Sequence, residues 1–180
     1  VVSGWKDWML YWCVVNLTDR RVDSTHKVCK GDIRYSDSHL AITKDTVYIS
    51  CWTSDSTVDG VYAYDILNPH TPKFLYQHDG FTPDSITVDE RNFIYVCDLI
   101  SNSIHQLTDS GQLVTIHTVS TRPWGIFYDD QHGVLYTTSE DSNVITVYRM
   151  EYSHQPGVPI EILNMDDKSI QLYEEALKDG

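Results

Sequence analysis

The chain has 180 residues and a mass of 20.7 kDa, enough for one domain or at most two small ones. Its 26 acidic and 13 basic side chains give a net charge of −13, so a phosphate backbone would repel it and we expect no nucleic-acid partner. It has no apolar run long enough to span a membrane, and its 12 Tyr, 5 Trp and 4 Phe are too many for a disordered chain.

Short strands dominate the first half of the chain. β-Branched and aromatic residues recur there in short alternating runs, and turn signals such as Asp59-Gly60 and Asp79-Gly80 separate the runs. These patterns predict seven strands, at residues 1–2, 8–13, 26–29, 40–43, 47–50, 60–64 and 73–76.

The second half repeats one strand pattern with a period of 40 residues, from Ile86 to Ile126. Each copy begins with proline, continues through a turn, and contains four predicted strands. In the first copy the strands are at residues 83–89, 94–97, 103–107 and 113–116. In the second copy they are at residues 123–129, 135–138, 144–148 and 159–163.

One short helix is expected at the end of the chain, over residues 169–178. Ile170, Tyr173 and Leu177 would share one face of it, and Asp166 or Asp167 would cap its start.

A period of about 40 residues with four strands per unit is typical of a β-propeller. The sequence therefore predicts an all-β fold of about four blades, each a four-stranded antiparallel sheet. Residues 1–165 would form the blades, the first of them incomplete, and residues 166–180 a helical tail.

The repeat unit resembles NHL-type repeats. Residues 81–120 match that pattern best, and residues 121–163 match it well. Within residues 81–120 the matching positions are Pro83, Ile86, Asp89, Ile94, Tyr95, Val96, Asp98, Asn102, Ile104, Leu107 and Gly111. The resemblance implies a propeller, and it extends to the C-terminal NHL region of tripartite-motif proteins, which recruits protein or RNA targets. The acidity of this chain favours protein.

The resemblance also raises a question of size, because propellers of this type usually have six blades. An open arc would expose sheet edges and the apolar faces of its end blades. Three arrangements would resolve this. The chain is part of a six-bladed ring, it closes as a four-bladed ring, or it associates with a second copy or another partner.

Loops on one face of the propeller would carry three tryptophans together with acidic and basic groups. Such a mixture suits recognition of a peptide or a sugar. The candidate ligand-binding residues are Trp5, Trp52, Asp84, Asp98, Arg122 and Trp124. We expect no catalytic residues, no metal ligands and no cofactor, because no nucleophile motif, zinc-ligand spacing or phosphate-binding loop occurs.

The leading hypothesis is a non-enzymatic recognition module that binds a protein or peptide partner on the loop face of the propeller. The alternative is a secreted propeller, either a sugar-binding lectin or a calcium-dependent lactonase-like or esterase-like hydrolase. Asp and Asn side chains of the loops would supply oxygen ligands in the hydrolase.

The four cysteines, Cys13, Cys29, Cys51 and Cys97, all lie in apolar strand-like runs without a C-x-x-C spacing. Buried free thiols fit the expected cytoplasmic location, and disulfides fit the secreted alternative.

Overall fold

The computed structural model describes residues 2–6, 9–16, 18, 21–27, 39–52, 59–139, 141–142, 145–149 and 160–165. These residues form fifteen β-strands in four sheets, and they contain no helix. The helix expected at 169–178 lies outside the described residues. In the described part of the chain, no helix is long and apolar enough to cross a membrane.

Each sheet is built from strands that follow one another directly in the sequence. The first sheet has three strands, β1 (Val2–Lys6), β2 (Met9–Asn16) and β3 (Arg21–Lys27). The second has four, β4 (Leu40–Ile42), β5 (Thr46–Cys51), β6 (Gly60–Asp65) and β7 (Lys73–Tyr76).

The third and fourth sheets are the two copies of the 40-residue repeat. The third contains β8 (Pro83–Val88), β9 (Ile94–Asp98), β10 (Ser103–Leu107) and β11 (Leu113–Thr118). The fourth contains β12 (Pro123–Asp129), β13 (Val134–Ser139), β14 (Ile145–Arg149) and β15 (Ile160–Met165).

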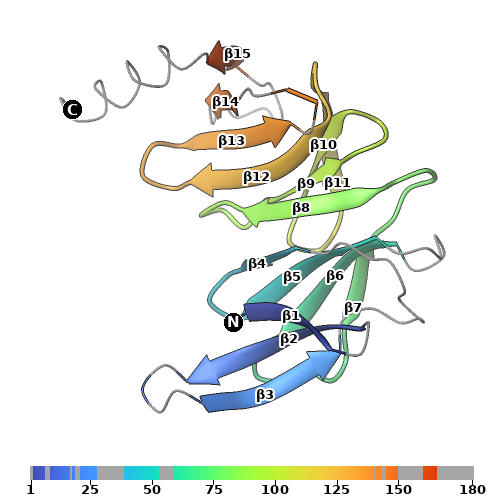
Figure 1. The fold of residues 1–180 in the computed structure, drawn as a ribbon, viewed down its shortest axis with the longest axis vertical. Helices are drawn as coiled ribbons and strands as arrows, with labels where there is room; N and C mark the ends of the chain where they lie inside the picture. Colours follow the sequence, from blue (N-terminus) through green and yellow to red (C-terminus); the bar gives the residue numbers. More distant parts are fainter. Residues whose placement is uncertain are drawn as a thin grey trace.

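Every neighbouring pair of strands is antiparallel. Figure 1 shows the four sheets following one another, from β1–β3 at one end to β12–β15 at the other. This arrangement confirms the prediction of an all-β fold made of four-stranded antiparallel blades.

The core lies between successive sheets, because alternate residues of a strand point to opposite faces. Ile86 of β8 packs with Val61 and Tyr48 of the preceding sheet. On the other face of the third sheet, Tyr95 and Ile104 pack against the fourth sheet.

Side-chain hydrogen bonds join the innermost strands of the third and fourth sheets. The backbone amide of Ile126 donates to Ser85 Oγ at 3.2 Å, and the amide of Tyr128 donates to Thr87 Oγ1 at 3.2 Å. Ser85 and Thr87 are buried, so these bonds replace the water that the two hydroxyls lose on folding.

The first sheet differs from the sequence prediction. β1 continues to Lys6, so Trp5 lies within a strand, opposite Leu10, and not in a loop. β3 covers Arg21–Lys27, whereas the prediction was 26–29. Its sequence, RVDSTHK, is mostly polar, and it becomes a strand because a short connection pairs it with β2.

The cysteines also differ from one another. Cys51, at the end of β5, is disulfide-bonded, whereas Cys97, in β9, is a free buried thiol. The interpretation as buried thiols therefore holds for Cys97 and not for Cys51.

Candidate functional site

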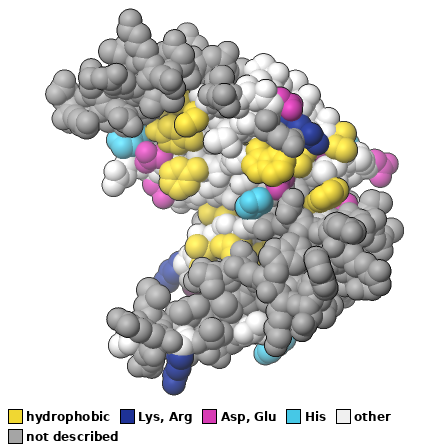
Figure 2. All heavy atoms as spheres, in the orientation of Figure 1, with side chains coloured by type: hydrophobic (Ala, Val, Ile, Leu, Met, Phe, Trp, Pro, Cys, Tyr) yellow, Lys and Arg dark blue, Asp and Glu magenta, His cyan; other side chains and the backbone are white. Residues whose placement is uncertain are grey.

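A hollow of about 560 Å³ runs along the innermost strands β4, β8 and β12. Apolar side chains line part of it, including the exposed Ile42 and Phe127, and the polar residues Ser85 and Thr87 alternate with them. Figure 2 shows the molecule hollowed on one side, with hydrophobic side chains within the hollow. Its lining is about equally polar and apolar, and its volume lies in the range of small-molecule sites.

Asp84 is the most unusual polar group beside this hollow. The residue is 1% exposed, and neither of its carboxylate oxygens accepts a hydrogen bond. The ionisable side chain that faces it is His39, which lines the hollow and whose Nδ1 lies 3.3 Å from Asp84 Oδ1. His39 is 45% exposed, so the pair joins a buried acid to an imidazole that solvent can reach.

Ser50 holds the two members of this pair in position. Its backbone amide donates to the carbonyl oxygen of His39 at 3.1 Å, and its Oγ accepts from the amide of His39 at 3.2 Å. The Ser50 hydroxyl also donates to the carbonyl oxygen of Asp84. The backbones of β4, β5 and β8 are therefore linked where the carboxylate meets the imidazole.

Cys97 shares this region but is not suited to act as a nucleophile. Burial raises the pKa of its thiol well above the usual range, and the negative charges of Asp84 and Asp98 raise it further. The thiol stays protonated, and a protonated thiol is a weak nucleophile.

Asp98 is as deeply buried as Asp84, but its oxygens are fully engaged. Oδ1 accepts from the amides of Thr82 at 3.1 Å and Ile100 at 3.2 Å, and Oδ2 accepts from the Ser101 hydroxyl at 2.7 Å. The amide of Leu99 also donates to the Thr82 carbonyl at 3.1 Å. Asp98 thus ties the loop before β8 to the loop after β9.

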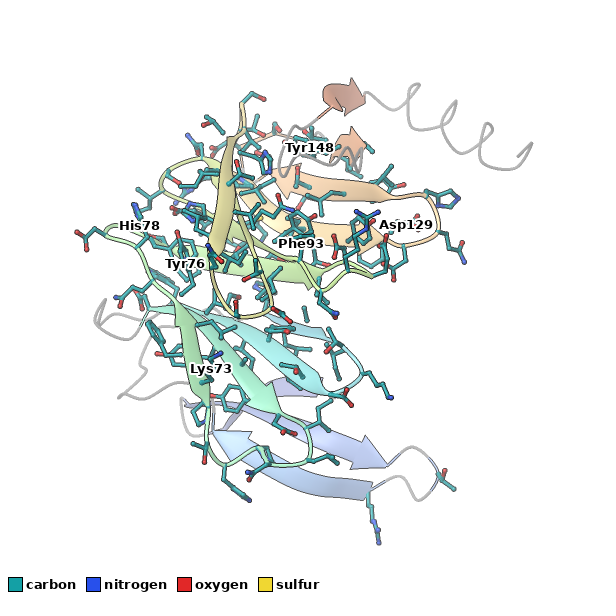
Figure 3. All side chains as sticks on the ribbon, turned by 180° about the vertical axis from the view of Figure 1, so that it is seen from behind. Lys73, Tyr76, His78, Phe93, Asp129 and Tyr148 are labelled. Carbon is teal, nitrogen blue, oxygen red and sulfur yellow. The ribbon has the colours of Figure 1, made fainter. Side chains whose placement is uncertain are left out.

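A second buried cluster surrounds His105 of β10. Its Nδ1 lies 3.0 Å from the Tyr76 hydroxyl and its Nε2 lies 3.1 Å from Ser103 Oγ, while the ring of Phe81 stacks on it at 4.8 Å. Figure 3 shows Tyr76 and His78 close together on the segment that leads from β7 to β8.

The His105 cluster does not have the geometry of a catalytic triad. In a triad the acid and the nucleophile use different ring nitrogens, but Ser103 and Asp98 both face Nε2, the latter at 3.7 Å. Burial lowers the pKa of His105, which keeps the ring neutral, and only 2% of its side chain is exposed. The cluster therefore joins β7 to β10 as part of the core.

The structure does not bring the six candidate residues together as one exposed cluster. Asp84 and Asp98 are buried, Trp52 and Arg122 are half-buried, and Trp124 is 40% exposed within β12. The side chain of Trp5 lies outside the described residues. Their role in ligand binding stays a prediction.

His39 is the functional candidate that sequence reasoning missed. It lies 45 positions before Asp84, in no motif, and it was one of eight scattered histidines. The signal that could have found it is the repeat itself. β4 and β8 are the innermost strands of adjacent blades, and His39 directly precedes β4 while Asp84 is the second residue of β8.

A calcium site does not fit the described residues. Calcium takes six to eight oxygen ligands, usually including several carboxylates. In the described ranges no three His, Cys, Asp or Glu side chains converge on one point, and the oxygens of Asp98 are already hydrogen-bonded.

The sequence matches no protein-family model and no curated protein, but the fold resembles many solved structures. One is a virginiamycin B lyase from Staphylococcus aureus, with a TM-score of 0.59 and 16% identity over 89% of this chain and 50% of that one. Another is a gluconolactonase from Xanthomonas campestris, with a TM-score of 0.53 and 15% identity over 73% of this chain and 41% of that one. A third is BamB from Moraxella catarrhalis, with a TM-score of 0.53 and 19% identity over 82% of this chain and 42% of that one.

These structures are β-propellers, so the comparisons establish this chain's fold as propeller-like, while nothing in them confirms the NHL or tripartite-motif family. The chain spans about half the length of the structures it matches. The lyase and the lactonase are enzymes, so the expectation of a non-enzymatic protein is corrected: this fold is shared with catalysts.

Proposed function

We propose that the chain supplies part of the active site of a β-propeller hydrolase, located at the hollow along β4, β8 and β12. The observation that carries this proposal is the pair of Asp84 and His39. A buried carboxylate without hydrogen bonds, 3.3 Å from a solvent-accessible imidazole, is the arrangement expected of a catalytic acid–base pair beside a pocket.

The two side chains divide the chemistry between them. Asp84 Oδ1 lies 3.3 Å from Nδ1 of His39, so its negative charge stabilises the imidazolium that forms when His39 takes a proton. His39 accepts that proton from a water molecule as the water oxygen bonds to the carbonyl carbon of an ester or lactone. The proton then passes to the departing alkoxide oxygen as the C–O bond breaks, which returns the imidazole to its starting state.

The walls of the hollow suggest the kind of substrate. Ile42 and Phe127 offer apolar surface. The hydroxyl groups of Ser85 and Thr87 each already accept a hydrogen bond from a backbone amide of β12. A lactone or ester with an apolar portion fits such a site better than a highly charged compound does. The similarity to a lactonase and a lyase supports the fold, and the residues of this chain support the chemistry.

The test is hydrolysis of 4-nitrophenyl acetate and glucono-δ-lactone by the wild-type chain and by His39→Gln and Asp84→Asn. We expect each substitution to lower kcat/KM by roughly 10²- to 10⁴-fold, the usual contribution of general acid–base catalysis. His70→Gln is the matched control, because His70 is an exposed histidine in the turn between β6 and β7. Hydrolysis that is absent in the wild type, or unchanged in His39→Gln with an unaltered melting temperature, contradicts the proposal.

Binding of a protein or peptide partner is a second candidate, supported by the 40% exposure of Trp124 on the innermost strand of the last sheet. The disulfide at Cys51 supports the secreted alternative for location, because disulfides persist mainly in oxidising compartments.

A further inference from the structure

The innermost strand of the third sheet, β8, turns one backbone edge toward the hollow. In an antiparallel pair, successive residues direct their N–H and C=O groups alternately toward the paired strand and away from it. The Asp89 amide donates to the carbonyl oxygen of Phe93 at 3.0 Å, and pairing with β9 continues in register back to Ile86. Ile86 and Val88 therefore direct their backbone N–H and C=O groups away from β9.

Ile86 and Val88 line the hollow with these backbone groups. Both residues are part of its wall, whereas their side chains pack into the core between the second and third sheets. The two amides are two strand residues apart, which is about 7 Å. The hollow therefore meets a short row of N–H donors and C=O acceptors along β8.

The following blade shows how such amides are satisfied elsewhere in the repeat. In β12 the corresponding amides are those of Ile126 and Tyr128. They donate at 3.2 Å to the hydroxyl groups of Ser85 and Thr87. The third sheet thus supplies one hydroxyl for each of these amides of the fourth sheet.

The second sheet has no hydroxyl groups at the matching positions. Ala41 and Thr87 each lie two residues before the amide that closes the turn to the second strand, and each faces the following sheet. His39 therefore corresponds to Ser85. Ala41 ends in a methyl group, and the His39 imidazole lies 3.3 Å from the Asp84 carboxylate. In this part of the described chain, the two amides of β8 therefore lack the hydroxyl acceptors that their counterparts in β12 have.

We propose that the amides of Ile86 and Val88 bind the substrate of the proposed hydrolysis, on which this inference rests. The Ile86 amide is the one beside His39, because its counterpart in β12 meets the residue that corresponds to His39. It donates to the carbonyl oxygen of the scissile ester while water bonds to the carbon, and so stabilises the negative charge that develops on that oxygen. The Val88 amide donates to a second acceptor of the substrate, about 7 Å along the strand.

The edge of β8 also indicates the class of substrate. The C=O groups of Ile86 and Val88 face the hollow together with their amides, so an extended chain that carries amide groups can pair with β8 as another strand would. Carbonyl oxygens two residues apart in such a chain point the same way and lie about 7 Å apart, which matches the two amides. The substrate is therefore an ester whose acyl group is a short N-acylated peptide.

Position 41 allows the Val88 amide to be capped without a change to His39 or Asp84. Ala41→Thr places a hydroxyl where the third sheet has that of Thr87, whereas Ala41→Val adds the same bulk without an acceptor. The variants are compared on the 4-nitrophenyl esters of N-acetylglycylglycine and of octanoic acid, which has a chain of the same length but no amide. We expect kcat/KM for the peptide ester to be roughly threefold to tenfold lower in Ala41→Thr than in Ala41→Val, the effect of one neutral hydrogen bond. The octanoyl ester should give equal values.

Hydrogen exchange, followed by NMR on isotope-labelled protein, checks the cap without any substrate. We expect the Val88 amide to exchange more slowly in Ala41→Thr than in Ala41→Val, because only threonine supplies an acceptor. Ala41→Ser, compared with the wild type, repeats both measurements with a smaller side chain, which guards against poor folding of the larger variants.

Two results would overturn this inference. One is a Val88 amide that exchanges equally fast in Ala41→Thr and Ala41→Val, and the other is a ratio of kcat/KM between these variants that is the same for both esters. A wild-type chain that hydrolyses neither ester contradicts the proposed hydrolysis itself, so the two failures are distinguishable.

Discussion

Two aspartates with the same burial play different roles at the scale of single residues. Asp84 and Asp98 are each 1% exposed, yet Asp98 accepts three hydrogen bonds and Asp84 accepts none. Hydrogen bonds to the charged form offset the desolvation of a carboxylate. Asp98 is therefore a structural group, whereas Asp84 depends on His39, which is why we assign the chemistry to Asp84.

Replacing Asp98 by alanine should destabilise the fold substantially. The amides of Thr82 and Ile100 would lose their acceptor, and the Thr82 amide lies in a buried loop, so we expect a loss of about 2–3 kcal/mol in the free energy of unfolding. Urea unfolding measures this change. Asp65→Ala is the control: its carboxylate also accepts two amides, but at an exposed turn where water can replace it. Equal losses in the two variants would contradict the structural role of Asp98.

At the scale of elements, a turn between two strands of one sheet can also pack against a strand of the neighbouring sheet. Gly111 lies in the turn between β10 and β11 with φ of +87°, a conformation that favours glycine. A Cβ there would collide with the backbone carbonyl of Leu75 in β7. Gly133, between β12 and β13, has φ of +64° and no neighbour within 4 Å of such a Cβ.

This pair of glycines separates backbone strain from contact between sheets. Gly133→Ala should cost about 1 kcal/mol, the usual penalty for a left-handed conformation. Gly111→Ala should cost about 1–3 kcal/mol more, because the added methyl group also overpacks the contact with β7. Thermal or urea unfolding of the two variants gives the difference, and equal destabilisation would show that the turn does not press on β7.

The strands show how far local sequence predicts the fold. Those of the third sheet were predicted within one or two residues, because proline, alternating apolar residues and a glycine turn all point to the same boundaries. β3 was misplaced because its alternation is weak and its position depends on pairing with β2. Pairing is a non-local contact that no short window of sequence contains.

At the scale of the whole molecule, a covalent bond adds to the packing between strands. Cys51 is disulfide-bonded and Cys97 is free. Of the four cysteines Cys97 is free, so the other three can form at most one disulfide within the chain. A disulfide stabilises mainly by restricting the unfolded chain.

Thiol titration of the denatured, unreduced chain should therefore find two free thiols. Reduction should lower the free energy of unfolding by about 2–4 kcal/mol, and Cys51→Ser should reproduce that loss. Cys97→Ala should remove one titratable thiol and leave the stability difference on reduction in place. Four free thiols in the unreduced wild type would contradict the disulfide and favour the cytoplasmic expectation.

The sequence alone determined the class of this protein, since the 40-residue period and the strand alternation are local properties that specify repeated antiparallel blades. It also singled out Asp84 as a candidate among six. Only the tertiary structure distinguished Asp84 from Asp98 and paired Asp84 with His39 beside the hollow. These features depend on which blades lie side by side and on how deeply each group is buried, and both are set by packing between segments far apart in the chain.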